Sequence, residues 1–495
     1  MPPMSELALT PLLTHVAAGA SVLDDLVRTR SRADIADNIR RWHACFSRHG
    51  LQAGDTVALL LRNRVEFIEV LLAGLEYGLR VVPLNWHLNT QERRQLLVDC
   101  QPALLVSERY FAASLASDYP LELLETLTSM QQPIEPSQTG YIMLYTGGTT
   151  GLPKGVIRKQ YHTLQELREA WQQLGHSAGL SGQGVHLVTG PLYHAAPLYF
   201  ALYDFLNGAP LLIMPFWQAK MALALVEQRK VRRCHLVPTQ MVHLLRLPEA
   251  VRARADIRSL ELILHGAAAI AGSVKQQMID WFGPVLEEYW GGSESGMCTR
   301  ISSEDWLQHP GSVGKALAHY QLRIVDMDDG HLLAAGEAGL VQIRHASGHL
   351  PFRYHGQAED EDEWFDLGDI GYLDDAGYLY LCDRLKNKVI SGGVNIYPAE
   401  VEKYLLALDA IADVAVLGLP DPVWGECLVA AIVLARPVGE LAQQVRVHLQ
   451  QLSAFKRPRI IYVFDDLQRL PSGKLRNHEL QQRIAGHDYQ QVLPL

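Results

Sequence analysis

Apolar and polar residues follow two alternating patterns along this chain, one with the period of a helix and one typical of a short buried strand. Residues 33–50 have the helical period, and residues 56–61 form an apolar run of strand length. A second helical stretch, 65–77, ends at Gly78, and glycine suits the position that follows a helix. Residues 80–84 form the next strand-like run. This order predicts a strand–helix–strand unit.

The same alternation continues through the middle of the chain. Short apolar runs recur, with helical stretches between them, at residues 185–189, 210–214, 233–237 and 260–264. Strands that are apolar throughout are typical of parallel sheets covered by helices on both faces. The predicted fold class is therefore α/β, with a large N-terminal domain of mixed and parallel sheets with helices. Residues 107–137 have the least regular pattern and are predicted to form a surface connection.

The pattern changes late in the chain. Residues 364–381 alternate apolar and polar positions and carry a turn signal at 374–377, which predicts a β-hairpin. A compact α+β pattern follows to the end. We therefore predict an N-terminal domain of residues 1–386 and a small C-terminal α+β domain of residues 387–495, with the boundary at Asn387.

Length, charge and cysteine content narrow the classes of protein. The chain has 495 residues, enough for several packed cores, and a formal net charge of -10. This acidic balance argues against general affinity for nucleic acid or an anionic membrane, although local groups can still hold ATP. The six cysteines are scattered without a CxxC pair, which argues against a disulfide framework or structural zinc site and favours a reducing, cytoplasmic location. The N-terminus lacks a signal-peptide pattern, and no apolar run reaches the roughly 18 residues of a membrane span.

A loop rich in glycine and threonine is the first candidate for chemistry. Residues 146–155, TGGTTGLPKG, follow an apolar run at 141–145. Glycines let backbone N–H groups point together at an anion, threonine hydroxyls add donors, and Lys154 adds positive charge. The loop does not match the GxxxxGKS/T consensus, and taken alone a flexible hairpin loop is the commoner explanation of such a decamer.

A wider resemblance decides between these two explanations. Residues 145–156, YTGGTTGLPKGV, closely resemble the phosphate loop of the ANL adenylating superfamily, which comprises acyl- and aryl-CoA synthetases, non-ribosomal adenylation domains and firefly luciferase. Further segments resemble this family's motifs and occur in its order over about residues 45–480. They are PLYH at 191–194, GAA at 266–268, WGGSE at 290–294, LGD at 367–369, Arg384 followed by VISGG at 389–393, and PSGK at 471–474.

The resemblance implies that the chain activates a carboxylic acid with ATP. The carboxylate would attack the α-phosphate, giving an acyl-adenylate and pyrophosphate. Because two anions must meet, such catalysis depends on charge neutralisation and positioning. The residues implied to bind ATP or AMP are Thr146, Gly147, Gly148, Thr149, Thr150, Lys154, Gly266, Ala267, Ala268, Glu288, Tyr289, Trp290, Gly291, Ser293, Asp369 and Arg384.

Individual nucleotide-binding roles follow from the same resemblance. The loop threonines and Lys154 are expected to hold the β- and γ-phosphates, and Ser293 the α-phosphate. Asp369, with Arg384 beside it, is expected to accept hydrogen bonds from the ribose hydroxyls. Trp290, where the family usually has tyrosine, is expected to stack on adenine, although a core tryptophan is the competing interpretation.

Three residues are implied to be catalytic. Lys474 is expected to bridge the carboxylate and the α-phosphate, although a lone lysine is usually a solvated surface residue. Glu294 is expected to bind Mg2+, a hard cation that prefers carboxylate oxygen. For His194 two interpretations remain: it shields the acyl pocket and moves aside for the thiol, or it is a buried structural histidine.

The family's second step passes the acyl group to a thiol, and the resemblance to aryl-CoA ligases implies CoA. Arginines suit bidentate phosphate contacts, and glycines let pantetheine pass close to the backbone. The phosphopantetheine of a carrier protein is the alternative acceptor. The implied CoA-binding residues are Gly392, Gly393, Trp424, Phe455, Arg457 and Arg459.

The implied acyl pocket contains several small residues. Amino-acid-activating relatives place an aspartate in the segment that reads YHAAP here, residues 193–197, so its missing carboxylate argues against an α-amino acid. The predicted substrate is a fatty, aromatic or bulky polycyclic acid. The implied pocket residues are His194, Ala195, Ala196, Gly266 and Gly292.

Besides Trp290, further positions depart from the family's pattern. Gly147 stands where many relatives have serine, Leu367 where threonine is usual, and Asn387 at a hinge that is usually Asp or Lys. The resemblance implies that the small domain rotates about this hinge. Two further hypotheses about the function stay open. One is a non-catalytic nucleotide- or ligand-binding homologue, against which the intact implied charged residues argue, and the other is a luciferase-like oxygenase on the same fold.

Overall fold

A seven-stranded sheet forms the first layer. The computed structural model describes residues 12–14, 16, 22–112, 120–124, 138–146, 154–357, 363–384, 389–391, 394–396, 398–421, 425–437, 439–452, 454–470, 473 and 475–494. In order across the first sheet the strands are β18 (Phe352–Tyr354), β8 (Lys154–Arg158), β7 (Tyr141–Thr146), β4 (Arg80–Pro83), β3 (Thr56–Leu60), β5 (Leu104–Ser107) and β6 (Leu121–Leu123). β3 pairs in parallel with β4 and β5, and every residue of β3 is buried. The predicted strand–helix–strand unit is confirmed as β3, helix α2 (Val65–Glu76) and β4.

A larger, thirteen-stranded sheet lies beside it. Across this sheet run β16 (Tyr320–Val325), β17 (Gly339–His345), β19 (Trp364–Leu373), β20 (Leu379–Arg384), β15 (Ser312–Ala316), β14 (Gly296–Ser302), β13 (Leu286–Gly292), β12 (Leu262–His265), β11 (Val231–Leu236), β9 (Val185–Val188), β10 (Leu211–Ile213), β1 (Leu23–Asp24) and β2 (Thr29–Arg30). The strands from β13 to β1 pair in parallel, and the predicted middle runs are confirmed as β9 to β12. The predicted hairpin is confirmed as the antiparallel pair of β19 and β20.

Helices cover both faces of the parallel strands. One core joins both sheets through α1 (Arg32–Arg48), α2, α5 (Leu164–Ser177) and α6 (Ala195–Leu206). A second core packs α7 (Ala219–Arg229), α8 (Pro238–Leu245) and α10 (Gly272–Phe282) against the other face. Val188 and Leu264 belong to the first core, while their neighbours Leu187 and Ile263 belong to the second. Because successive strand residues point to opposite faces, covering both faces requires strands that are apolar throughout.

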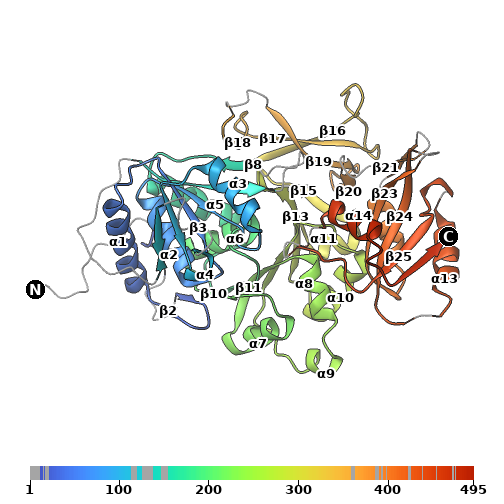
Figure 1. Ribbon diagram of the computed structural model, residues 1–495, viewed down its shortest axis with the longest axis horizontal. Coiled ribbons are helices and arrows are strands. Elements are labelled where there is room, and N and C mark those ends of the chain that lie inside the picture. The colour runs from blue at the N-terminus through green and yellow to red at the C-terminus, as the bar shows by residue number, and fades with distance from the viewer. Residues whose placement is uncertain are drawn as a thin grey trace, which may run out of the picture.

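The C-terminal part has its own sheet and core. Its strands are β21 (Val389–Ser391), β22 (Val394–Ile396), β23 (Ile411–Asp421), β24 (Gly425–Leu434), β25 (Ile460–Phe464) and β26 (Gln491–Pro494). Its longest helices are α12 (Pro398–Leu406), α13 (Leu441–His448) and α14 (Asn477–Ala485). In Figure 1 this red part lies at the end of the molecule opposite the blue N-terminal layers. The predicted class, a large α/β part with a smaller α+β part, is confirmed. The hinge residue Asn387 lies outside the described residues, so the boundary stays a prediction.

Four further α-helices belong to the described part of the N-terminal region. They are α3 (Thr90–Cys100), α4 (Arg109–Ala112), α9 (Glu249–Arg252) and α11 (Ser303–Gln308). The described parts of 107–137, predicted to be a surface connection, contain α4 and β6. Among the helices in the described ranges, none is both long and apolar enough to cross a membrane.

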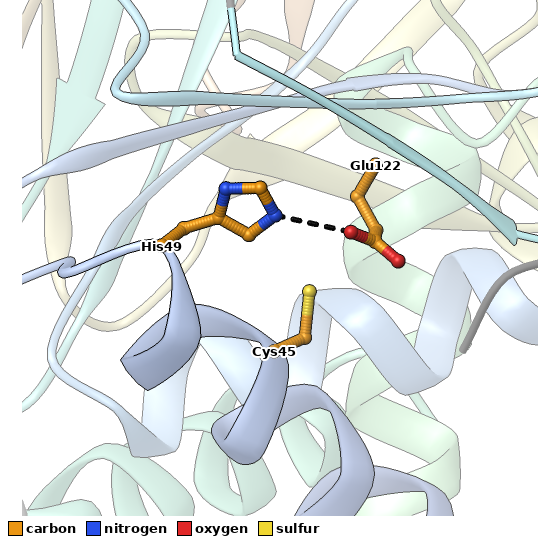
Figure 2. A group of neighbouring side chains, drawn as sticks. All are labelled: Cys45, His49 and Glu122. Carbon is orange, nitrogen blue, oxygen red and sulfur yellow. Dashed lines mark hydrogen bonds and ion pairs between the residues drawn. The ribbon is translucent and has the colours of Figure 1, made fainter. Parts of the chain in front are cut away.

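A small polar cluster ties the end of α1 to β6. Figure 2 shows His49 and Glu122 facing one another above the thiol of Cys45. His49 Nε2 lies 3.0 Å from a Glu122 carboxylate oxygen, and Arg48 Nη2 donates to the same oxygen at 3.0 Å. Burial, followed by the charge of Glu122, raises the pKa of Cys45 to about 12. Because a thiol binds metal as thiolate and Arg48 already neutralises the carboxylate, this cluster is best understood as an ion-pair contact between elements.

Candidate active site

A cavity of about 3590 Å³ opens at the carboxyl ends of the parallel strands of both large sheets. Residues shortly after β4, β9, β11 and β12 line it, including Asn85, Gly190, Val237 and Ala267. Gly473, from the C-terminal part, also lies on its wall. In open α/β sheets ligands bind in the crevice outside these strand ends. The topology therefore collects residues from distant parts of the sequence at one site.

The two ends of the glycine–threonine loop lie on adjacent strands. Thr146 ends β7 and pairs with Lys154, the first residue of β8. Residues 147–153 lie outside the described part of the chain, so the predicted contributions of Gly147, Gly148, Thr149 and Thr150 stay predictions. Thr146 lines the cavity, and the ammonium of Lys154 lies 4.8 Å from the centre of the Tyr354 ring. This cation–π contact fixes where the lysine charge lies.

Glu294 lies in the tight turn between β13 and β14. A Cβ on Gly291 would lie 1.8 Å from the carbonyl oxygen of Gly296, so the two strands approach closely enough to exclude any side chain there. The Tyr354 hydroxyl donates to Glu294 Oε1 at 3.3 Å. Burial, followed by the Glu294 charge, raises the pKa of Tyr354 to about 12. Within the described residues no cation pairs with Glu294, so its carboxylate faces the cavity with capacity for a ligand.

Asp369 and Trp290 meet at the wall of this cavity. The indole Nε1 of Trp290 donates to Asp369 Oδ2 at 2.8 Å, and both residues are buried. Trp290 also belongs to a hydrophobic core with Val313 and Phe365. The two interpretations of Trp290 are therefore not exclusive, because it packs in a core and also lines the cavity. The backbone of Asp369 pairs with that of Arg384 across β19 and β20.

The residues predicted beside adenine occupy two different positions. Ala267 and Ala268 line the cavity, and Ala267 has a left-handed φ of 67°, uncommon for a residue with a side chain. Gly266 lies behind the wall, where an added Cβ would be 2.6 Å from the Tyr289 carbonyl oxygen. The Glu288 carboxylate accepts a hydrogen bond from Lys275 Nζ at 2.7 Å, and both side chains are buried. This ion pair occupies the carboxylate that was expected to contact the nucleotide.

The predicted acid site lies at the start of α6. His194 directly precedes the helix, and its ring centre is 4.5 Å from that of Tyr193. Of the other predicted pocket residues, Ala195, Ala196 and Gly292 line the cavity and Gly266 does not, and their role with the acid stays a prediction.

An aromatic wall that the sequence analysis missed continues from there along α6. Trp171 meets Tyr199 and Tyr203 edge-on, with ring centres 5.8 and 5.9 Å apart. The spacing of two tyrosines one helical turn apart was the available signal. Arg158, at the end of β8, is a further missed residue of this wall.

The remaining predicted residues lie outside this wall or outside the described chain. Arg457 donates to the carbonyls of Leu452 and Gln450 at 2.7 and 3.1 Å, and Arg459 is exposed. Neither arginine lines the cavity. The side chains of Arg384, Gly392, Gly393, Trp424, Phe455 and Lys474 fall outside what the structure describes. The predicted CoA contacts therefore stay predictions.

His235 is a buried histidine that lines the cavity, and it gives a prediction about how the stability of the fold depends on pH. His235 Nε2 lies 3.0 Å from the Tyr289 hydroxyl. Burial, with His186 as a smaller influence, lowers the pKa of His235 to about 3 from 6.5. Because the pKa of His235 is lower in the folded protein than in the unfolded chain, this group favours the folded state above pH 6.5. As the pH falls, the unfolded chain binds the proton first, and this contribution to stability is lost. We expect a loss of about 1.4 kcal/mol between pH 7.5 and 5.5 from this group.

In urea unfolding, the variant His235→Gln should lose about 1.4 kcal/mol less stability than the wild type between the two pH values. The buried His43 and His265, whose pKa values are also lowered by burial, keep their own contributions. His162→Gln, at an exposed position, should keep the wild-type slope. An unchanged slope in His235→Gln would contradict the assignment.

Comparisons with known proteins agree with this geometry. A family model described as AMP-binding enzyme matches residues 15–349, and one described as AMP-binding enzyme C-terminal domain matches residues 400–474. The indoleacetate–CoA ligase of Aromatoleum aromaticum is 30% identical over 489 residues, covering 92% of this chain and 94% of that protein. The 2-succinylbenzoate–CoA ligase of Oceanobacillus iheyensis is 30% identical over 447 residues, covering 87% and 89%.

Solved structures share the fold over nearly the whole chain. The o-succinylbenzoate CoA synthetase of Bacillus subtilis, in complex with its acyl-adenylate intermediate, superposes with a TM-score of 0.82 and 26% identity. The match covers 96% of this chain and 98% of that structure. The same enzyme in complex with ATP and magnesium gives a TM-score of 0.83 and 26% identity, covering 95% and 99%.

Proposed function

This chain belongs to the AMP-binding enzyme family, and from that membership we propose that it is an AMP-forming ligase that joins a hydrophobic carboxylic acid to CoA. In the first half-reaction a carboxylate oxygen bonds to the α-phosphorus of ATP while pyrophosphate leaves. In the second half-reaction the CoA sulfur bonds to the acyl carbon while AMP leaves. The acid is of the fatty, aromatic or bulky polycyclic class.

The observation that carries this proposal is the shared cavity. Thr146, Glu294, Asp369 and His194 come from four separate segments and all line it. Phosphate, metal, ribose and acyl groups of one reaction would need side chains of these types close together. A cavity that collects them at the strand ends supports a two-substrate reaction more directly than any one motif does.

In the nucleotide half of the site, Thr146 and Lys154 hold the terminal phosphates, Ser293 the α-phosphate and Asp369 the ribose hydroxyls. Glu294 fits Mg2+, because its carboxylate faces the cavity without a cationic partner among the described residues. Bound there, the metal supplies positive charge to the phosphates. Lys474 supplies a second positive charge, between the carboxylate and the α-phosphate.

CoA is the proposed acceptor because the relatives at 30% identity are named as CoA ligases. A carrier protein is the second candidate acceptor. Both acceptors present the same thiol, so the cavity chemistry is shared. Their difference lies in contacts beyond the phosphopantetheine.

Pyrophosphate exchange into ATP, measured with a panel of acids, tests the proposal. We expect exchange with hydrophobic acids, and thioester and AMP when CoA is added. Exchange without thioester on CoA would favour the carrier-protein acceptor. Nucleotide binding without exchange for any acid would contradict the enzymatic proposal and favour a non-catalytic homologue.

The contact of Trp290 with Asp369 gives a sharper prediction. In Trp290→Phe the ring remains but the N–H that holds the Asp369 carboxylate at 2.8 Å is lost. We expect the KM for ATP to rise about tenfold, the scale of one charge-assisted hydrogen bond. The preference for ATP over 2′-deoxy-ATP should shrink at the same time, because the carboxylate that reads the ribose is no longer fixed.

Trp306→Phe provides the matched control, since Trp306 is also a buried tryptophan of the larger sheet region. It should leave the ratio between the two nucleotides unchanged. Equal nucleotide ratios in Trp290→Phe and the wild type would show that Trp290 acts through packing alone.

A further inference from the structure

Arg158 extends from the end of β8 to the turn that carries Glu294. Its Nε donates to the carbonyl oxygen of Ser293 at 2.8 Å, and its Nη2 donates to that of Gly292 at 3.2 Å. Its guanidinium carbon lies 4.2 Å from the centre of the Tyr199 ring. The side chain is thus held between the turn and α6, and it lines the cavity.

In the described structure the Arg158 guanidinium is met by neutral groups. Among the residues that the structure describes, no carboxylate forms an ion pair with Arg158. Glu294 is near enough to influence it but does not contact it. An arginine carries five N–H groups; the two carbonyls use two, and the Tyr203 hydroxyl is close enough to take a third. A half-buried guanidinium with N–H groups left over offers an anionic ligand a charge-assisted partner.

The position of the guanidinium is given by its neighbours on the turn and on α6. An added Cβ on Gly296, at the end of the turn, would lie 3.4 Å from Nη1. Tyr203 also interacts with the guanidinium and lies one helical turn after Tyr199. Because α6 rises about 1.5 Å per residue, Tyr199 lies about 7 Å along the helix from His194. Because the guanidinium lies against the Tyr199 ring, it lies further along α6 than His194, which precedes the helix.

The walls around this position suit a planar ring. Trp171, Tyr199 and Tyr203 present ring faces and edges, as aromatic pairs prefer. In the described structure the hydroxyls of Tyr161 and Tyr199 make no hydrogen bond to the protein, and both residues line the cavity. This part of the cavity thus combines aromatic surface with one cation and phenol hydroxyls.

We propose that Arg158 recognises a second carboxylate on the acid, so that the preferred substrate is an aromatic acid with two carboxylates. One carboxylate is activated beside His194, and the other pairs with the free N–H groups of Arg158. This inference rests on the proposed ligase function and specifies its substrate class. Arginine suits this role because its planar donors match a carboxylate.

Matched acid pairs test the inference through pyrophosphate exchange. The pairs are phenylacetate with 4-carboxyphenylacetate, and 3-phenylpropionate with 3-(4-carboxyphenyl)propionate. We expect the wild type to favour the dicarboxylic member by at least tenfold in kcat/KM, the scale of a charge-assisted hydrogen bond. Arg158→Gln should reduce that ratio by at least tenfold, and Arg158→Lys should keep part of it.

The ratio of kcat/KM between the dicarboxylic and monocarboxylic acids distinguishes recognition of the second carboxylate from a purely structural role of Arg158. If Arg158 only holds the turn at Gly292 and Ser293, or contacts the reacting carboxylate, Arg158→Gln would lower kcat/KM equally for both acids of a pair. The ratio between the two acids would then stay unchanged. That result would overturn the inference, as would a wild type that prefers the monocarboxylic member. Lys159→Gln, which removes the neighbouring exposed charge, should leave the ratio at its wild-type value.

The proposed ligase function can fail separately. Exchange with monocarboxylic acids alone would leave the function standing and overturn only the second-carboxylate inference. Absence of exchange with every acid would overturn both.

Discussion

Replacing Lys474 by alanine is expected to slow adenylate formation about 100- to 1000-fold, the usual effect of removing one group that stabilises a developing charge. The reaction brings a carboxylate to a phosphate, so a cation between them lowers the barrier more than it strengthens ground-state binding. Pyrophosphate exchange at saturating ATP and acid measures the effect on kcat. The expectation rests on the PSGK resemblance, because Lys474 itself lies outside the described residues.

Gly473, the residue that precedes Lys474 in the sequence, is described by the structure. Gly473 lines the cavity, and a Cβ added to it would lie 3.5 Å from Thr239 Oγ1 and 3.8 Å from Ala268 Cβ. Lys403→Ala is the matched control, because Lys403 is an exposed lysine at the edge of the same cavity. It should keep wild-type exchange. Wild-type exchange in Lys474→Ala would remove this residue from the mechanism.

Glu294→Gln should have an effect of similar size, about 100- to 1000-fold on exchange. Glutamine keeps the shape of the side chain but loses the charge that attracts a divalent cation. The Mg2+ concentration for half-maximal activity should rise together with the loss of rate. Titration of Mg2+ at fixed ATP separates this from a general loss of folding, which would lower the rate without moving the titration curve.

Tyr354→Phe is the control for the surroundings of Glu294. It removes the hydroxyl that donates to Glu294 at 3.3 Å and keeps the ring beneath Lys154. We expect less than about a tenfold loss, since one hydrogen bond to a charged group is involved. If Glu294→Gln kept both the wild-type rate and the wild-type Mg2+ curve, the metal role of Glu294 would be wrong.

Much of the architecture could be predicted from the local pattern of apolar and polar residues. The unit of β3, α2 and β4 follows from an apolar run of strand length, a helical period and Gly78, whose φ of 84° suits the position after a helix. The hairpin of β19 and β20 follows from alternation around a turn signal. These predictions succeeded because they depend on residues close together in sequence.

Part of the candidate site could be predicted from the resemblance of short motifs to those of the family. Thr146, Glu294, Asp369 and His194 were predicted as separate functional residues, and the structure brings all four to one cavity. Their individual roles stay predictions. The resemblance supplied no information about the charge state of neighbouring groups, and the Lys275 partner of Glu288 was therefore not foreseen.

The most specific contacts could not be predicted, because they join segments whose neighbours are decided by strand order. Trp290 meets Asp369 only because β13 and β19 belong to the same large sheet. Arg158 meets Ser293 only because the end of β8 comes to the turn after β13. Arg158 ends an apolar strand, and the sequence gave no indication of which residues its side chain would contact.

The sequence by itself determined the elements, the fold class and the ATP-dependent chemistry, because periodicity and short motifs are local properties of a chain. Tertiary structure alone decided that Asp369 is held by an indole, that α6 provides an aromatic wall, and that Arg158, which pairs with no carboxylate among the described residues, lines the same cavity. Recognition of one acid among many depends on distances between side chains of different elements, and those distances exist only after the sheets have packed.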